Sequence, residues 1–233
     1  MIGVIANTIA VIVGGLIGLV GKKVIPETWN DIIVKAIGLV AIYVGITGAL
    51  NGENTLILIM SLVFGAMIGE GLKLDERLDS LAGNMEKRFD AKGGKSNFAE
   101  GFITASLLMC VGAMTVVGAL NAGLKGDNSL LFTKTAMDGV SAIMFTASLG
   151  IGVIFASVPV FIIEGGIVLL AAAISPVLTT SVVNEMTCAG SLLIVALGLN
   201  MTVGTKLKVM NYMPAVFLPI AFCPLYDWIV SLL

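Results

Sequence analysis

Long apolar runs without charged side chains are the feature that most constrains this sequence. Residues 1–21 contain no charged residue, and about 20 apolar residues suffice for a helix to cross a bilayer. Over the chain, 58% of residues are hydrophobic, 12% are charged and the mean hydropathy is +1.05, whereas soluble domains carry about 25% charged residues. The chain is therefore predicted to be an all-α polytopic membrane protein.

The apolar runs between charged residues predict about eight transmembrane helices in a single membrane domain, residues 1–233. We place them at residues 1–21, 36–52, 54–69, 101–124, 131–156, 159–174, 186–203 and 209–233. Pro159 and Pro176 mark helix boundaries because proline lacks the N–H that an interior position donates. Pro214, Pro219 and Pro224 are expected to kink or break the last helix.

Residues 70–100 form the one hydrophilic segment and hold 13 of the chain's 28 charged residues. Apolar residues recur there at steps of four and three, as on one face of a helix; they are Leu74, Leu78, Leu81, Met85 and Phe89. We predict a connector with an amphipathic helix that lies along the lipid headgroups. A regulatory or lipid-sensing surface is the alternative interpretation.

Lysine and arginine gather in alternate loops of the eight-helix scheme. Loop one carries Lys22 and Lys23, loop seven carries Lys206 and Lys208, and the basic residues of the 70–100 connector fall in loop three. Because cytoplasmic loops are enriched in Lys and Arg, the connector is predicted to be cytoplasmic and both termini to be outside. Residues 1–21 lack a basic leading segment and a small-residue cleavage site, so we interpret them as a retained span of a cell (inner) membrane protein.

A weak internal sequence similarity predicts a repeat. The glycine and proline pattern of Gly14, Gly15, Pro26, Gly38 and Gly45 recurs at Gly165, Gly166, Pro176, Gly190 and Gly198. Spans 1–3 and 6–8 would then form a 3+3 inverted repeat flanking a central helix pair, a plan found in many secondary transporters. Two small-x-x-x-small pairs, Gly14 with Gly18 and Gly65 with Gly69, indicate close helix packing or a homodimer.

Ionisable residues within the predicted spans indicate a functional site, since each costs roughly 2.5 to 3.5 kcal/mol on insertion scales. Lys134 and Asp138 are four residues apart, so they share a helix face and can pair. In the functional interpretation, Lys134 attracts an anionic group while Asp138 takes a proton, a cation or a substrate ammonium. In the alternative, Lys134 extends to the nearby outer surface and the pair only fixes the helix.

Glu164 and Glu185 are the other two acidic candidates. Glu164 has no charged neighbour in its run, so it either faces Asp138 or Lys134 across the bundle, is protonated, or lies near an interface. Glu185 follows Ser181 and Asn184 at a predicted helix start, where a carboxylate also interacts favourably with the helix dipole. Capping is therefore the stronger interpretation for Glu185.

Uncharged polar residues in the spans could line a polar route or bond between helices. With them, the predicted substrate- or ion-binding set is Lys134, Asp138, Glu164, Glu185, Asn7, Asn200 and Thr104. No cofactor or metal is expected, because the chain has no histidine and its three cysteines are far apart. Without histidine there is also no Ser-His dyad or H-E-x-x-H motif, so we do not expect an enzyme. No basic patch indicates a nucleic-acid partner.

Several motifs carry a resemblance to a known family. They are the opening Met-Ile-Gly with Asn7 and Gly14-Gly15, EGFITASLLMCVGAM at 100–114, GDNSLLFTKTAMDG at 126–139, Glu185-Met-Thr and Gly198-Leu-Asn. Together they resemble the prokaryotic membrane family catalogued as domain of unknown function 554, over essentially the whole chain. The resemblance implies an integral inner-membrane protein for which transport is the activity proposed.

The resemblance also bears on the candidate site. Lys134, Asp138, Gly139, Glu185 and Asn200 match the family's motif positions, whereas Glu164 stands where the resemblance leads us to expect glutamine. We therefore predict a secondary transporter or channel-like permease for a small solute or ion, coupled to H⁺ or Na⁺ through the intramembrane carboxylates. The alternative is a structural or regulatory membrane protein that transports nothing.

Overall fold

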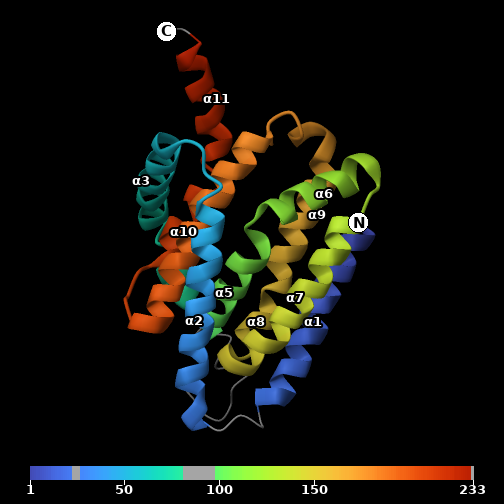
Figure 1. Ribbon diagram of the computed structural model, residues 1–233, viewed down its shortest axis with the longest axis vertical. Helices are drawn as coiled ribbons and strands as arrows, with labels where there is room; N and C mark the ends of the chain where they lie inside the picture. The colour runs from blue at the N-terminus through green and yellow to red at the C-terminus, as the bar shows by residue number, and fades with distance from the viewer. Residues whose placement is uncertain (23–26, 81–97, 232–233) are drawn as a thin grey trace.

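The computed structural model describes residues 1–22, 27–80 and 98–231, and every regular element in these ranges is a helix. The elements are α1 (Ile2–Lys22), α2 (Glu27–Ala49), α3 (Thr55–Leu72), α5 (Phe98–Cys110), α6 (Ala113–Lys125), α7 (Ser129–Leu149), α8 (Gly152–Phe155), α9 (Ser157–Ile174), α10 (Thr180–Val203), the 3₁₀ helix η1 (Val209–Val216) and α11 (Pro219–Val230). Figure 1 shows them as an elongated bundle from which α11 projects at one end. The all-α prediction is confirmed for the described residues.

The bundle is organised by close pairs of helices that are distant in sequence. The α1 helix packs along α7, and α2 packs along α10 (Figure 1). Glycines make the first contact possible, because a Cβ on Gly14 or Gly18 would collide with the backbone carbonyl of Gly139 or Ile143. Helices that approach through small residues in this way are typical of membrane bundles.

The second small-residue pair, Gly65 with Gly69, also allows two helices to pack closely. A Cβ on Gly65 would collide with Ala215, and one on Gly69 would collide with the backbone of Asn211, so α3 packs on η1. Both predicted glycine pairs therefore pack within the chain. The homodimer stays a prediction.

Among the described residues, five segments are long and apolar enough to cross a membrane, and the number rises to seven if each of two bent helix pairs is one span. The five are Ile2–Gly21, Asp31–Ala49, Thr55–Leu72, Gly152–Ile174 and Thr180–Val203. The α7 helix has 21 residues but is not among them, because its lysine, aspartate and hydroxyl residues lower its hydropathy. A multi-pass bundle agrees with the prediction, while the count of eight is not confirmed.

Two breaks lie inside runs that the sequence predicts to be continuous. The run 101–124 bends by 56° between α5 and α6, where Gly112 has φ 149°, a value that L side chains rarely adopt. The run 131–156 ends early at Gly150, with φ 87°, before the short helix α8. The predicted break of the last run is confirmed, since η1 and α11 meet at 48° between Pro214 and Pro219.

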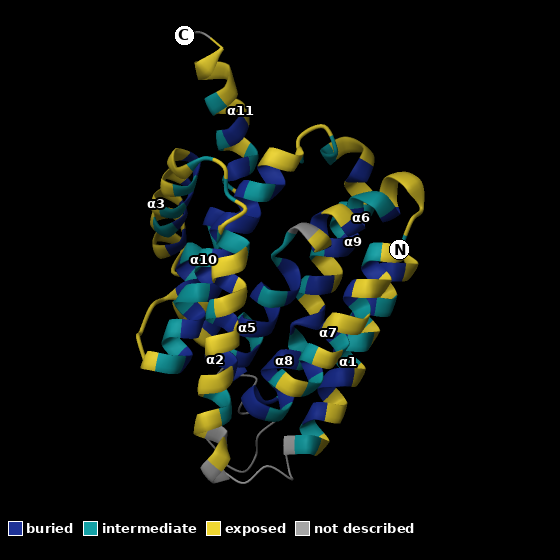
Figure 2. Ribbon diagram, in the orientation of Figure 1, coloured by how far each residue is buried: buried dark blue, intermediate teal, exposed yellow. Residues whose placement is uncertain are grey.

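The outer surface of the bundle is apolar. Figure 2 shows exposed residues along the outward faces of α1, α2 and α3, and these include Ile9, Val13, Leu39, Tyr43 and Ile59. A soluble monomer rarely exposes so continuous an apolar surface. The pattern fits a multi-pass membrane protein whose outer side chains contact lipid.

Part of the hydrophilic connector is described. Residues 74–80 are helical, with Leu78 buried and Leu74 half-buried, as one apolar face would require. The rest of the predicted amphipathic helix, with Leu81, Met85 and Phe89, lies outside the described residues.

Candidate functional site

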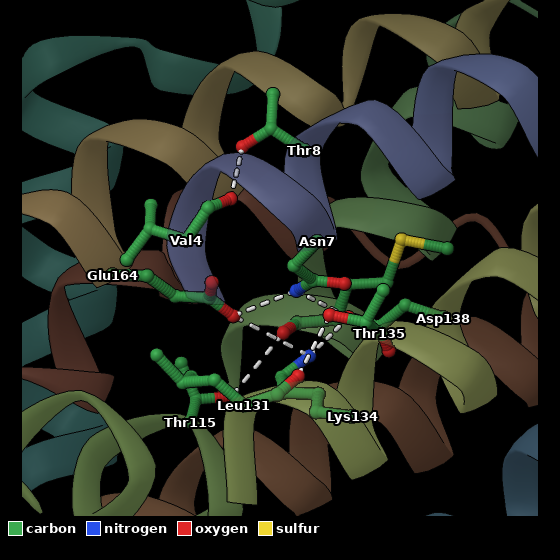
Figure 3. A network of polar contacts seen from close by, with 10 residues as sticks. Val4, Asn7, Thr8, Thr115, Leu131, Lys134, Thr135, Asp138 and Glu164 are labelled. Carbon is green, nitrogen blue, oxygen red and sulfur yellow. Dashed lines mark hydrogen bonds and ion pairs between the residues drawn. The ribbon is translucent and has the colours of Figure 1, made fainter. Parts of the chain in front are cut away.

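Four polar side chains from three helices meet inside the bundle. Asn7 lies on α1, Lys134 and Asp138 lie one turn apart on α7, and Glu164 lies on α9 (Figure 3). The glycine contact between α1 and α7 brings the backbones close enough for Asn7 to reach Asp138. We call these four residues the ionic cluster.

The cluster is a connected network. Lys134 Nζ pairs with Asp138 Oδ2 and lies 3.7 Å from Glu164 Oε1. Asn7 Nδ2 donates to Asp138 Oδ2 at 2.9 Å and to Glu164 Oε1 at 2.9 Å. The predicted Lys134–Asp138 pair is therefore formed, and Glu164 faces it across the bundle.

The cluster is closed to solvent in this structure. Asn7 and Glu164 are 0% exposed, Lys134 is 5% exposed and Asp138 is 7% exposed. The alternative in which Lys134 extends to the outer surface is therefore wrong. Three ionisable groups are held in the interior of the bundle, where each is costly unless it is paired.

The charges and the hydrogen bonds of the cluster do not balance. Two carboxylates face one ammonium, so the fully ionised set would carry one excess negative charge in a buried space. Two buried oxygens, Asn7 Oδ1 and Glu164 Oε2, have no hydrogen-bond partner in the part of the chain that the structure describes, although buried polar atoms are nearly always paired. One proton or one monovalent cation would remove the excess charge.

A broken helix lies beside the cluster. Thr115, in the first turn of α6, donates from Oγ1 to the backbone carbonyl of Met109 in the last turn of α5, at 3.2 Å, and Figure 3 draws Thr115 among the residues of this polar network. This bond bridges the break at Gly112. Non-helical backbone at membrane depth is tolerated where protein buries it or where it lines a cavity.

Glu185 lies elsewhere and has different partners. Its Oε1 accepts hydrogen bonds from the backbone amides of Glu53 and Asn54, both at 2.7 Å, at the point where α3 begins. Glu185 is fully buried, and Oε2 has no hydrogen-bond partner. The prediction that Glu185 caps its own helix is wrong, because α10 begins at Thr180 with Thr179 as its N-cap; Glu185 instead binds the two amides that precede α3.

The last two predicted residues, Asn200 and Thr104, lie outside the hydrogen-bond network of the ionic cluster. Asn200 closes the turn after α10, where its Oδ1 accepts from Leu207 N at 3.0 Å and its Nδ2 donates to Leu207 O at 2.8 Å. Thr104 is fully buried on α5, and its hydroxyl has no hydrogen-bond partner. Neither bonds to Lys134, Asp138 or Glu164.

Comparison with known proteins places the chain in a family. Residues 2–224 match the model of the family described as "Protein of unknown function (DUF554)". The chain belongs to this family. It is 32% identical over 223 residues to the "Uncharacterized membrane protein YdfK" of Bacillus subtilis (strain 168), with 94% of each chain covered.

A second relative is more distant. The chain is 29% identical over 221 residues to the "Uncharacterized protein YqgA" of Escherichia coli (strain K12), again with 94% of each chain covered. No solved structure matches. The predicted DUF554 resemblance is confirmed, and the matched range contains the whole ionic cluster.

One polar residue that holds this fold together was not predicted from the sequence. Asn211 of η1 is buried, donates to Glu70 Oε2 at 2.6 Å and accepts from Asp75 N at 2.8 Å. It therefore ties the end of α3 and the start of the connector to η1. The signal in the sequence is an asparagine within a proline-interrupted apolar run. Such a run leaves backbone groups that a nearby polar side chain can bond.

Proposed function

We propose that this protein is a secondary transporter or channel-like permease for a small solute or ion, coupled to H⁺ or Na⁺. The ionic cluster is the coupling site. Asp138 and Glu164 bind the proton or cation, Lys134 supplies the opposing charge, and Asn7 orients both carboxylates.

The observation that carries this proposal is the unbalanced, sealed cluster. A fold that needed only rigidity would be better served by apolar residues of similar volume, because buried ion pairs often cost as much as they return. Two carboxylates with one lysine, and two unpartnered oxygens, are instead suited to a site that exchanges one positive charge. Intramembrane ionisable residues are common in proton and ion pathways.

The arrangement of the helices supports an inverted repeat of spans 1–3 and 6–8. The three predicted copy pairs are all in contact: α1 with α9, α2 with α10, and α3 with η1. Across the α2–α10 contact, Gly38 faces Gly198 while Gly45 faces Ser191, the neighbour of Gly190. A two-fold axis produces this reciprocal pattern, and inverted repeats with broken helices are frequent in secondary transporters.

The topology proposed for this function has eight crossings, with both termini outside and the connector in the cytoplasm. Counting α7 as a span, since it packs along the whole of α1, would add one crossing to the seven. Both chain ends lie in the upper half of Figure 1, while α8 lies at the opposite end. Phe98, which follows the connector, packs on Gly152 of α8, so the connector would be on the side away from the termini.

A structural or regulatory role is the second candidate. It is favoured by the burial of the ionic cluster. The bonds of the cluster hold α1, α7 and α9 together, and its four residues are at most 7% exposed. In that case, neutralising a carboxylate would change stability alone. Transport measurements separate the two candidates.

The test uses purified protein in liposomes loaded with a pH-sensitive or Na⁺-sensitive dye and exposed to panels of small solutes. We expect solute-dependent movement of H⁺ or Na⁺ in the wild type, its loss in Asp138→Asn, and a changed pH or Na⁺ dependence in Glu164→Gln. Asp31→Asn is the matched control, because Asp31 is an exposed carboxylate that pairs with Lys35. If both cluster variants behave as the wild type for every solute, or if the wild type equals empty liposomes, the proposal is wrong.

The role given to Glu164 has a particular consequence. Because the family resemblance leads us to expect glutamine at this position, relatives with glutamine would keep a Lys134–Asp138 pair without the excess charge. Glu164→Gln is therefore expected to shift the pH or Na⁺ dependence of transport even where the solute is still moved. Asp138→Asn should remove coupling altogether.

A further inference from the structure

We propose that a cavity between α9 and η1 binds one acyl chain of a membrane phospholipid. The cavity has a volume of about 530 Å³, within the range of roughly 300 to 1,000 Å³ typical of ligand sites. It lies among α9, the break between α5 and α6, the first turns of α10, η1 and the start of α11. This proposal is independent of the transport function.

The cavity wall has almost no polar group to offer a ligand. Among the described lining residues, Thr187 contributes a hydroxyl, while Cys110, Met186 and Met213 contribute only sulfur atoms. The Thr187 hydroxyl already donates to the carbonyl of Val183 at 2.7 Å, and Cys110 is a weak hydrogen-bonding group. An apolar cavity of this kind stays free of water, so its occupant must be apolar.

The cavity opens toward the side of the bundle. Ile162, Leu170 and Phe217 line it and are also 64%, 57% and 47% exposed, so they form a rim that faces outward. Its inner wall is formed by buried residues, including Val116 and Met186. In a chain that spans a membrane, an outward-facing apolar rim contacts lipid hydrocarbon.

The packing of the helices explains why the opening exists. The α9 helix packs on α6, α1 and α5, whereas η1 packs on α3 and α10, and the cavity lies between α9 and η1. An unfilled apolar cavity destabilises a protein in proportion to its volume. Acyl chains are the apolar material at the opening, so a phospholipid tail is the occupant that the surroundings supply.

One residue offers a clean way to fill the cavity. Gly166 lines it, and a Cβ added there would meet no atom within 4 Å. Gly166→Phe therefore adds a ring to open space without a backbone clash. Val13→Phe is the matched control, because Val13 is an exposed apolar residue on α1 that does not line the cavity.

The experiment places the full-length protein in nanodiscs of phosphatidylethanolamine and phosphatidylglycerol that contain a phospholipid with a diazirine on one acyl chain. After illumination, mass spectrometry maps the crosslinked residues. We expect crosslinks at the buried residues Val116 and Met186 in the wild type and in Val13→Phe. Gly166→Phe should lose them while keeping crosslinks on outer residues such as Leu39.

Three results would overturn the proposal. The wild type could show no crosslink at Val116 or Met186, which decides the question even if Gly166→Phe does not fold. Gly166→Phe could fold and keep those crosslinks unchanged. A free fatty acid with the same diazirine could label these residues where the phospholipid does not, which would assign the cavity to a different ligand.

Discussion

Glu164 and Glu185 are both fully buried carboxylates in apolar helices, but Glu164 is bonded by side chains and Glu185 by the backbone. Glu164 contacts two side chains, the Asn7 amide and the Lys134 ammonium, from two other helices. Glu185 accepts from two backbone amides, those of Glu53 and Asn54. Each keeps one carboxylate oxygen without a partner.

The difference separates a site that can change from one that cannot. Backbone amides at the start of α3 are fixed dipoles, so they hold Glu185 in one place and satisfy donors that the helix itself leaves free. Side-chain charges can gain or lose a counter-ion, and those of the ionic cluster come from three separate helices. A buried carboxylate therefore indicates exchange of an ion only when its partners are themselves ionisable.

Removing the one cation of the ionic cluster should have the largest effect. Lys134→Met leaves Asp138 and Glu164 buried without a positive partner, and breaking a buried pair in this way costs about 3–5 kcal/mol. The free energy of unfolding, measured by titration of mixed micelles with a denaturing detergent, should fall by this amount. Lys35→Met is the control, since Lys35 forms an exposed pair with Asp31 worth about 0–1 kcal/mol.

A double variant sharpens this prediction. Adding Asp138→Asn to Lys134→Met removes one of the two uncompensated carboxylates, so part of the lost stability should return. An additive loss in the double variant would mean that the two residues do not act as a unit. The charge argument for the cluster would then fail.

Glu185 should show the opposite balance of stability and activity. Glu185→Ala removes the acceptor of two buried amides, which should cost about 2–3 kcal/mol of unfolding free energy. The coupled flux per folded molecule in liposomes should be unchanged, whereas Asp138→Asn should lose it. Should Glu185→Ala keep its stability and lose its flux, Glu185 would belong to the ion pathway and the contrast with Glu164 would disappear.

The sequence predicts much of the helical scheme because apolar runs and charges are local signals. The boundaries of α1, α3 and the second half of α10 follow from them directly. The break between α5 and α6 does not, because residues 101–124 form an unbroken apolar run in which Gly112 is one glycine among many. Its position depends on a distant contact: Gly190 of α10 leaves the space into which the Val111 side chain fits.

The candidate site divides in the same way. The pairing of Lys134 with Asp138 follows from their spacing of four residues. The meeting of Glu164 with Lys134 depends on how the helices pack, so the sequence could only offer it as one alternative among three, and the hydrogen bond of Glu164 with Asn7 was not predicted. For Glu185, the sequence predicted a cap at the start of its own helix, which is wrong because α10 begins at Thr180, and its true partners, Glu53 and Asn54, are more than 130 positions away in sequence.

Asn211 tests a site that is intermediate between the two carboxylates, since it bonds one backbone amide and one acidic side chain. Asn211→Ala should lower the unfolding free energy by about 1–2 kcal/mol, mainly because the Asp75 amide loses its acceptor. Hydrogen exchange at that amide should become faster. Asn51→Ala is the control, because Asn51 is exposed and bonds only to Gly48 O.

The smallest effect is expected at an exposed carboxylate that also bonds to a backbone amide. Asp127 Oδ1 accepts from the Ser129 hydroxyl at 2.6 Å and from Ser129 N at 2.9 Å, just before α7, and these two bonds lower the pKa of Asp127. A lowered pKa in the folded state stabilises the protein above the unfolded-state value, near 3.9, and this gain is lost as the pH falls through the folded-state pKa.

Ser129→Ala should therefore raise the pKa of Asp127 toward its ordinary value, as measured from the carboxyl carbon resonance of labelled aspartate. Stability should change only in acid, and coupled flux at neutral pH should be unaffected, because Asp127 is already ionised there. A change in the pH dependence of flux near neutrality would contradict this. It would mean that solvent-exposed groups at the start of α7 take part in the ion exchange that we assign to the buried Lys134 and Asp138. Burial would then no longer separate the carboxylates that exchange an ion from those that do not.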